Sequence, residues 1–264
     1  GRITSNAGAF EHKPATSTIN CTVSGTIEDS MDDILGKVHE AGLTLKAGCG
    51  IGYDFSTLRP RGAFVSGAGA YTSGPLSFMD IYDKMCFTVS SAGGRRGAQM
   101  GTFDVGHPDA MEFIRAKREN GRLRQFNLSL LVTDEFMQAA LDGRDWELTS
   151  RTTGEVVETV PARRLLREIA EASWECADPG VQFDTTINRW NTTPRAGRID
   201  ASNPCSEHLR LANSACNLAS INLLSYLSED GEFDAEAFEH TVRVVVTAQD
   251  ILVGGSEYPT DKIA

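Results

Sequence analysis

Three polar side chains able to take part in catalysis alternate within residues 202–207: Asn203, Cys205 and Glu207. Side chains at i, i+2 and i+4 of an extended or looping backbone project to one side, so these three can converge on one small molecule. A thiol can deliver a hydrogen atom or act as a nucleophile, a carboxylate can act as a general base, and an amide can hold a hydroxyl. The spacing alone also fits an Asn-Pro turn with a buried cysteine and an exposed glutamate, and it favours that plainer alternative.

The other cysteines are unremarkable when each is taken alone. Cys21 and Cys216 each lie in a strand-like stretch and are more typical of a core than of a catalytic site. Cys49, Cys86 and Cys176 are expected in the core as well. Six cysteines in 264 residues are too sparse for a disulfide scaffold, and the N-terminus has no export signal, so a reducing cytoplasm is the expected compartment.

The chain is acidic, because 36 acidic and 25 basic residues give a formal charge of −11, and 41% of its residues are apolar. These values are typical of a folded globular protein and exclude a disordered, collagen-like or coiled-coil chain. No apolar run approaches the roughly 18 residues that cross a bilayer, so no membrane partner is expected. The negative balance argues against general nucleic-acid binding, because few basic residues are available to displace counterions from phosphates.

Helical and strand patterns alternate along the chain, which predicts an α/β fold. The helices are expected to begin at Ser30 (with a stop at Gly42), Pro75, Pro108, Thr133 (with a stop at Gly143), Pro161 and Asp234. The strands are expected around residues 19–23, 43–46, 127–132, 181–183 and 217–224, with a hairpin of 146–150 and 155–160. A glycine-rich segment occupies residues 48–69.

Five motifs, in one order along the chain, resemble the catalytic subunit of ribonucleotide reductases, most closely the adenosylcobalamin-dependent class II enzymes. The motifs are STINCTVSG at 17–25, GCGIGYDFSTLRP at 48–60, GGRRGAQMG at 93–101, NPCSE at 203–207 and SACNLASINL at 214–223. The resemblance implies about half of a ten-stranded α/β barrel that carries the radical cysteine on an inner finger loop. Both chain ends look truncated, so residues 1–264 are expected to form one partial catalytic barrel domain.

The resemblance implies the reduction of ribonucleoside diphosphates or triphosphates to deoxyribonucleotides. Cys205 matches the cysteine whose thiyl radical takes the 3′ hydrogen, Glu207 the base for the 3′-hydroxyl proton, and Asn203 the amide that holds the ribose hydroxyls. Cys21 and Cys216 match the pair that supplies electrons by closing to a disulfide. Their Cα atoms must then approach to about 4.4–6.8 Å, which neighbouring strands, about 4.8 Å apart, allow.

The resemblance also implies residues that bind substrate and effector. Hydroxyl-rich segments at Ser5 and Ser17 match the region that contacts substrate phosphate and ribose, and hydroxyl and N–H groups suit an anion in an acidic chain. Gly50 and Gly52 permit close backbone approach to a flat base. The residues matched to a deoxynucleoside triphosphate effector and its relay loop are Asp29, Arg59, Arg95 and Arg96; for the relay loop the alternative is a solvated flexible segment.

The expected cofactor is adenosylcobalamin, and the expected partners are nucleotide substrate and effector, a second copy of the chain and an external dithiol reductant such as thioredoxin. The five histidines show no metal-ligand spacing, so no protein-bound metal is expected. No D-x-H-x-x-G signature is present, so a histidine of that motif is not expected to hold the cobalt.

Two alternatives stay open at this point. A class I catalytic subunit would use the same loop chemistry but receive its radical from a partner protein. A nucleotide-binding regulatory module without catalysis would keep Asp29 and Arg59 and ignore Cys205, although the complete cysteine set argues against it. In either catalytic case the 264-residue chain alone is expected to be inactive and to associate through uncovered apolar surface.

Overall fold

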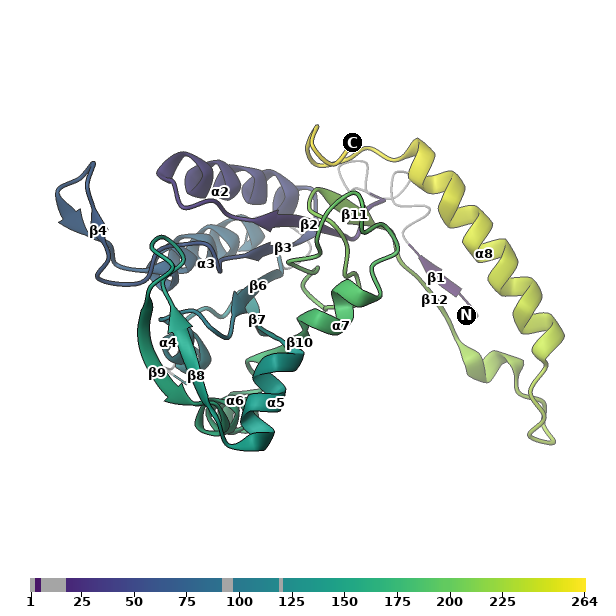
Figure 1. Ribbon diagram of the computed structural model, residues 1–264. Coiled ribbons are helices and arrows are strands. Elements are labelled where there is room, and N and C mark those ends of the chain that lie inside the picture. The colour runs from purple at the N-terminus through teal and green to yellow at the C-terminus, as the bar shows by residue number, and fades with distance from the viewer. Residues whose placement is uncertain (1–2, 6–17, 92–96, 119–120) are drawn as a thin grey trace.

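The computed structural model describes residues 3–5, 18–91, 97–118 and 121–264 (Figure 1). Strands and helices alternate through most of the chain, which confirms the α/β prediction. The strands are β1 (Ile3–Ser5), β2 (Cys21–Thr26), β3 (Gly50–Asp54), β4 (Phe64–Val65), β5 (Ala70–Tyr71), β6 (Gln99–Asp104), β7 (Phe126–Val132), β8 (Asp145–Thr149), β9 (Val156–Pro161), β10 (Gly180–Phe183), β11 (Ser214–Cys216) and β12 (Ala219–Ile221). The helices are α2 (Met31–Lys46), α3 (Pro75–Ser91), α4 (Ala110–Arg115), α5 (Asp134–Asp142), α6 (Ala162–Cys176), α7 (Asp184–Arg189), the 3-10 helix η1 (Leu223–Tyr226) and α8 (Ala235–Gly255).

A six-stranded sheet in the order β10-β7-β6-β3-β2-β11 is the centre of the molecule. The first five of these strands are mutually parallel, because helical crossovers such as α2 and α3 return the chain to the same end of the sheet. The last strand, β11, runs antiparallel to β2. Within the described residues the sheet is open, with β10 and β11 at its edges, and does not close into a barrel.

The two faces of the sheet have different coverings. Helices α2 and α3 pack on one face, over a cluster of Tyr53, Phe55, Tyr82 and Phe126 whose ring centroids lie between 5.1 and 6.5 Å apart. The opposite face is approached by the segment between α7 and β11, green in Figure 1. Because strand residues alternate between faces, glycines 50 and 52 of β3 point to this second face, whereas Tyr53 points to the helices.

Several predicted boundaries agree with the structure. Helix α5 begins after Thr133, whose hydroxyl accepts a hydrogen bond from the Phe136 backbone N–H, and ends at Gly143 in the left-handed conformation. The hairpin of β8 and β9 and the helices that begin near Pro75, Pro161 and Asp234 are also confirmed. Local capping and turn signals in the sequence therefore predicted the bounds of these elements correctly.

The strand predicted over residues 43–46 is wrong, because this stretch is the last turn of α2. Gly42 does not stop the helix. Gly42 faces α3, where a Cβ atom would be in ordinary contact with the sulfur of Met85 at 3.7 Å, and Leu45 continues the buried face. The helix ends instead at Ala47, followed by Gly48 with a φ of 83°. Packing against α3 thus outweighs the weak helix propensity of one glycine.

Two further differences concern strands. The glycine-rich segment contains a central strand, β3, which was not predicted because its apolar alternation is interrupted by Gly50 and Gly52. Of the strand predicted over residues 217–224, only the part in β12 is a strand; β11 ends just before this range, and η1 begins within it. Only β11 joins the main sheet, and β12 pairs with β1.

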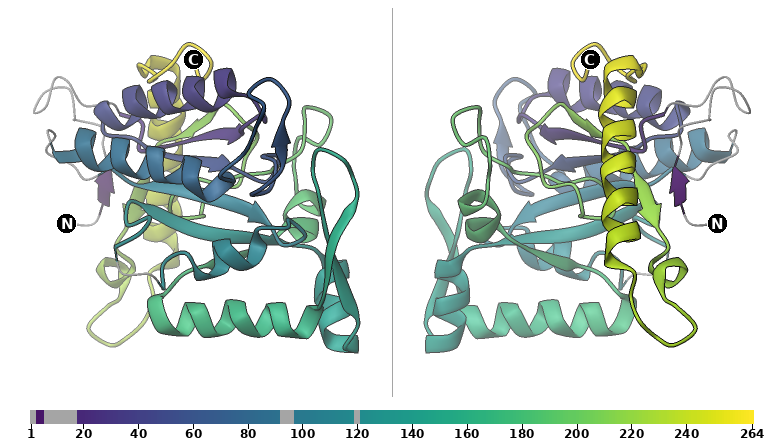
Figure 2. Two further views of the ribbon diagram at one scale, coloured as in Figure 1. Left: turned by 90° about the vertical axis from the view of Figure 1, so that its left-hand side faces the viewer. Right: turned by 90° about the vertical axis from the view of Figure 1, so that its right-hand side faces the viewer.

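Helix α8 lies beside the β1–β12 pair and away from the main sheet (Figures 1 and 2). None of its residues is buried. Among the helices of the described segments, none is both long and apolar enough to cross a membrane. In those same segments, no group of three or more His, Cys, Asp or Glu side chains is arranged to hold a metal ion.

Candidate active site

Cys21 and Cys216 are direct neighbours across the β2–β11 pair, although 195 residues separate them in sequence. The antiparallel register places Cys216 opposite Cys21 and Ser214 opposite Val23. Opposed residues of antiparallel strands have Cα atoms about 4.5–5.5 Å apart, which lies within the range that a disulfide requires. All six cysteines lie in the described segments and none forms a disulfide, so the pair is present as two thiols.

The environment of this pair keeps Cys216 protonated. A hydrogen bond with Cys21, burial and the negative charge of Glu207 all raise the pKa of the Cys216 thiol. The contribution from Glu207 also shows that this carboxylate lies near the pair. The structure therefore brings together three of the predicted site residues, from β2, β11 and the segment between them.

Cys205 lies at the tip of a β-turn on the same face of the sheet. The turn runs from Asn203 to Ser206, and the Ser206 backbone N–H donates to the Asn203 carbonyl at 3.1 Å. Pro204 occupies the second position, where its fixed φ suits the turn. Cys205, at the third position, is exposed, whereas the two residues before the proline are fully buried. The plainer prediction of a buried cysteine is thus wrong, and the turn presents the thiol outward.

Asn203 is used to build the turn. Its side-chain oxygen accepts a hydrogen bond of 2.9 Å from the His208 backbone N–H, and the residue is 0% exposed. Its Nδ2 has no hydrogen-bond partner in the described part of the chain. Contact between Asn203 and a ribose hydroxyl stays a prediction. Glu207, by contrast, is exposed, so its carboxylate can reach a bound molecule.

Gly50 and Gly52 lie directly beneath the turn. A Cβ atom at Gly52 would lie 1.6 Å from the Ser202 carbonyl oxygen, and one at Gly50 would lie 2.8 Å from the Pro204 ring. The close approach that these glycines permit is therefore made by the Cys205 segment, which needs bare backbone in β3 to lie against the sheet. Contact of either glycine with a substrate base stays a prediction.

The matching family model, described as ribonucleotide reductase, barrel domain, covers residues 19–264. The chain belongs to the ribonucleotide reductase barrel-domain family. It is 43% identical to the vitamin B12-dependent ribonucleotide reductase of Streptomyces coelicolor, over 90% of this chain and 27% of that protein. It is 42% identical to the vitamin B12-dependent ribonucleoside-diphosphate reductase of Mycobacterium tuberculosis (strain H37Rv), over 88% of this chain and 33% of that protein. The chain thus spans about a quarter to a third of the length of these relatives.

Other predicted residues of this ribonucleotide reductase domain fall into three groups. Asp29, after β2, and Arg59, after β3, meet in an ion pair of 2.7 Å, and the Arg59 backbone N–H also donates to Asp29. Ser5 lies in β1 opposite Ala219, three residues beyond Cys216. Ser17, Arg95 and Arg96 lie outside the described residues.

Two residues of the reductase domain that the sequence analysis did not select contact the Cys205 turn. Gln182 of β10 donates from Nε2 to the hydroxyls of Ser202 and Ser206, at 2.8 and 3.0 Å. Asn127 of β7 donates from Nδ2 to the Pro204 carbonyl at 2.6 Å. Each is a single amide in a strand, Gln182 buried and Asn127 exposed, and strand alternation alone does not separate such an amide from an ordinary surface residue.

A buried carboxyl group lies at the carboxyl end of β3. Burial raises the pKa of Asp54 to about 7. Its Oδ1 accepts hydrogen bonds from the backbone N–H of Ser56 at 3.2 Å and from the Thr102 hydroxyl at 3.4 Å. Thr102 also donates to the Asp200 carbonyl at 3.0 Å, which connects β6 to the segment that leads to Cys205. Asp54 therefore belongs to the polar core between the sheet and that segment.

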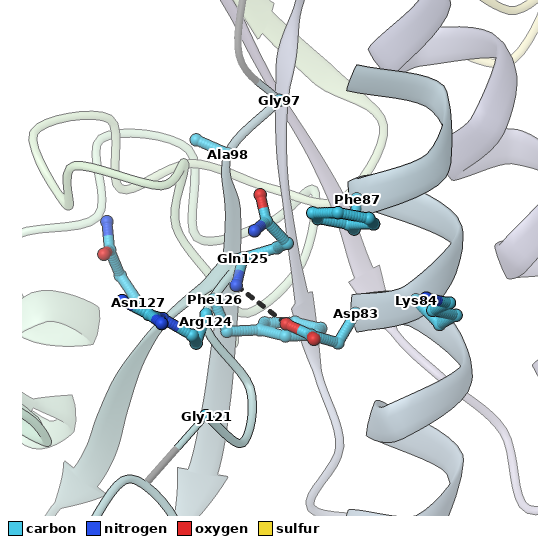
Figure 3. Close-up of a pocket in the computed structure, with 10 residues that line it drawn as sticks. All are labelled: Asp83, Lys84, Phe87, Gly97, Ala98, Gly121, Arg124, Gln125, Phe126 and Asn127. Carbon is cyan, nitrogen blue, oxygen red and sulfur yellow. Dashed lines mark hydrogen bonds between the residues drawn. The ribbon is translucent and has the colours of Figure 1, made fainter. Parts of the chain in front are cut away.

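A pocket of about 800 Å³ opens at the amino ends of β6 and β7, beside the Cys205 turn. Figure 3 shows Phe87 and Lys84 of α3 on one side of it and Asn127 and Arg124 on the other. Asp83 accepts a hydrogen bond from the Gln125 backbone N–H at 2.7 Å, and burial raises the pKa of this carboxyl. Because Asn127 contacts both the pocket and Pro204, a molecule in the pocket would lie next to the turn.

Proposed function

We propose that the protein reduces ribonucleotides to 2′-deoxyribonucleotides, with Cys205 as the radical residue and Cys21 and Cys216 as the reducing pair. The observation that carries the proposal is the register of β2 and β11, which opposes the two cysteines on the sheet that also supports the Cys205 turn. Two buried or half-buried thiols beside an exposed third thiol are an unusual arrangement for a structural core. This arrangement is what a two-electron reduction next to a radical centre needs.

Each residue has a distinct part in the proposed reaction. The Cys205 sulfur, as a thiyl radical, takes the 3′ hydrogen and returns it to C3′ at the end of the cycle, and Glu207 accepts the proton of the 3′-hydroxyl and later gives it back. A radical at C3′ weakens the neighbouring C2′–O bond, and the 2′-hydroxyl leaves as water after it gains a proton. Cys21 and Cys216 together supply two electrons and two protons and close to a disulfide. The raised pKa of Cys216 supports this part, because the thiol keeps its proton until it is needed.

We propose adenosylcobalamin as the cofactor, because the relatives are named as vitamin B12-dependent. When bound, it would supply the radical that converts the Cys205 thiol to a thiyl. The exposed position of Cys205 fits this requirement, since a buried thiol could not be reached from outside the chain. The chain has no D-x-H-x-x-G motif, so its own residues would not offer a histidine of that kind to the cobalt.

The remaining predicted contacts belong to the same proposal. Ser5 and Ser17 would contact substrate phosphate and ribose, and Gly50 and Gly52 the base, whether the substrate is a diphosphate or a triphosphate. Asp29, Arg59, Arg95 and Arg96 would respond to a deoxynucleoside triphosphate effector. The ion pair between Asp29 and Arg59 supports a shared site at the carboxyl ends of β2 and β3, where a phosphate could take the place of the carboxylate.

Further proposed partners are a second copy of the chain and an external dithiol such as thioredoxin. Exposed apolar side chains on α2 and α3 support the homodimer: Met31, Leu35, Leu43, Ile81 and Phe87 are each at least 41% exposed. An external dithiol is needed because a disulfide between Cys21 and Cys216 must be reduced before the next turnover. Six cysteines without a disulfide agree with a reducing compartment such as the cytoplasm.

An anaerobic assay of the whole protein tests the proposal. We expect deoxynucleotide formation from ribonucleoside diphosphate or triphosphate when adenosylcobalamin and a dithiol are present and no partner subunit is added. Cys205→Ala should abolish turnover without changing the thermal unfolding midpoint. Turnover that requires a radical-donating partner would reject the cobalamin part, and turnover by Cys205→Ala would reject the radical role of Cys205.

A further inference from the structure

We propose that Gln182 and Asn127 are positioning residues that hold the Cys205 turn at a fixed place above the sheet. They come from neighbouring parallel strands, since β10 pairs with β7. The expected effect on catalysis rests on the proposed function. The support of the turn by these two side chains does not depend on it. Neither residue contacts the Cys205 sulfur in the hydrogen bonds that define the turn, so both would act through the residues around it.

Gln182 joins the two sides of the turn. One amide nitrogen, Nε2, donates to the hydroxyl of Ser202 at 2.8 Å and to the hydroxyl of Ser206 at 3.0 Å. These two hydroxyls lie 3.3 Å apart, on either side of the segment that contains Cys205. Because an amide NH2 has two hydrogens in fixed directions, a single side chain sets the separation of both ends of the turn. Gln182 is only 5% exposed, so water does not readily replace it.

The turn needs this support because its backbone is unfavourable at Ser206. Ser206 has a φ of 63°, in the left-handed region that residues with a Cβ atom seldom adopt. One backbone hydrogen bond, from Ser206 to Asn203, closes the turn. The bond from Gln182 to the Ser206 hydroxyl therefore stabilises the one residue whose conformation is costly.

Asn127 and β3 complete the support from the other side. Asn127 donates to the Pro204 carbonyl at 2.6 Å, at the residue just before Cys205. Gly52 lies against the Ser202 carbonyl, so the turn is in contact with β3, β7 and β10 at once. These strands belong to the same sheet as β2 with Cys21, and the sheet thus fixes the position of Cys205 relative to the reducing pair.

The test compares Gln182→Leu and Asn127→Leu with Gln99→Leu in the whole protein. Gln99 is a matched control: it is a buried amide of the same sheet, but it contacts Tyr53 and Tyr82 on the helix-covered face. Hydrogen exchange of a peptide that covers residues 202–209 reports the turn directly. We expect exchange at least tenfold faster in Gln182→Leu and faster in Asn127→Leu, with no change in Gln99→Leu.

Steady-state kinetics supplies the second readout. If the turn positions the radical cysteine, Gln182→Leu should lower kcat at least tenfold and leave KM within twofold. Unchanged exchange in both variants, or an equal increase in Gln99→Leu, would overturn the support of the turn. Faster exchange with unchanged kcat would show that the two side chains support the turn but that this support does not affect catalysis. A wild-type protein that reduces no nucleotide would reject the proposed function, and the exchange result would still decide the structural part.

Discussion

At the scale of single residues, the three central thiols differ in exposure, and the pKa of one of them, Cys216, is raised. Cys205 is exposed at the tip of its turn, Cys216 is half-buried, and Cys21 is buried. Alkylating reagents react with the thiolate, so a raised pKa slows the reaction at a given pH. The raised pKa of Cys216 comes from its folded surroundings, which are the hydrogen bond with Cys21, burial and the charge of Glu207.

We expect iodoacetamide at pH 8 to label Cys205 well before Cys216 in the reduced protein. The pKa of Cys216 is raised, so a smaller fraction of it is thiolate at pH 8 than for an ordinary cysteine, and raising the pH should speed its labelling. Mass spectrometry of labelled peptides over time gives both rates. Equal labelling rates for Cys205 and Cys216 at pH 8 would contradict the described geometry.

Asp54 makes stability depend on pH. Its pKa is near 3.8 in an unfolded chain and about 7 in the folded protein, so the folded form holds the proton more tightly. This contribution is complete below pH 4 and is lost as the pH rises through 7, with a limiting slope of about 1.4 kcal/mol per pH unit. Asp54→Asn should therefore gain stability relative to the wild type between pH 5 and pH 8. Thermal unfolding midpoints of both proteins check this, and a constant difference across that range would refute it.

At the scale of elements, the glycines of β3 and of α2 have opposite roles. Gly52 faces the Ser202 carbonyl, where a Cβ atom would lie 1.6 Å away, whereas a Cβ atom at Gly36 of α2 would meet nothing within 4 Å. A methyl group at position 52 must displace the backbone of Ser202, whereas a methyl group at position 36 only improves helix propensity.

We expect Gly52→Ala to destabilise the protein by more than about 2 kcal/mol and to displace the Cys205 turn. Gly36→Ala is the matched control and should be neutral or stabilise α2 by up to about 1 kcal/mol. Denaturant unfolding of both variants gives the two energies. If Gly52→Ala were as stable as Gly36→Ala, the turn would not lie against β3.

Sequence signals and structure agree best where the signal is local. The cap at Thr133 and the stop at Gly143 define α5 within a residue of the prediction. Gly42 and Gly50 show where local signals fail to predict structure. Gly42 lies inside helix α2 and does not end it, and Gly50 lies in the central strand β3. Both positions face residues that are distant in sequence: Gly42 lies near Met85 of α3, and Gly50 lies so close to Pro204 that a Cβ atom would clash with its ring. Such contacts have no signature in the local sequence.

The residues of the candidate site likewise fall into those that the sequence identified and those that it did not. The five motifs and their resemblance selected Cys205, Glu207, Cys21 and Cys216. The structure places Cys21 opposite Cys216, Glu207 near this pair, and the Cys205 turn on the same face of the sheet. Gln182 and Asn127 were not selected, since each is a single amide in a strand and its function depends on a turn that comes later in the chain. A sequence pattern identifies residues that perform chemistry more readily than residues that hold them in place.

At the scale of the whole molecule, the described chain leaves much apolar surface exposed. Helix α8 has no buried residue, and Val244, Val246, Ile251 and Val253 are each at least 47% exposed. Large exposed apolar patches favour association. We expect the 264-residue chain alone to sediment as a mixture of associated species and to reduce no nucleotide. A single monomeric boundary in sedimentation velocity, or turnover by this chain alone, would contradict that expectation.

The central claim is that three distant thiols act on one sugar ring, and one turnover without external reductant tests it most directly. The whole, reduced protein is mixed anaerobically with adenosylcobalamin and ribonucleotide, then quenched and mapped by mass spectrometry. The account predicts about one deoxynucleotide per chain, a disulfide that joins Cys21 to Cys216, and Cys205 recovered as a thiol. Deoxynucleotide formation with Cys21 and Cys216 both still reduced, or with Cys205 in the disulfide, would contradict it.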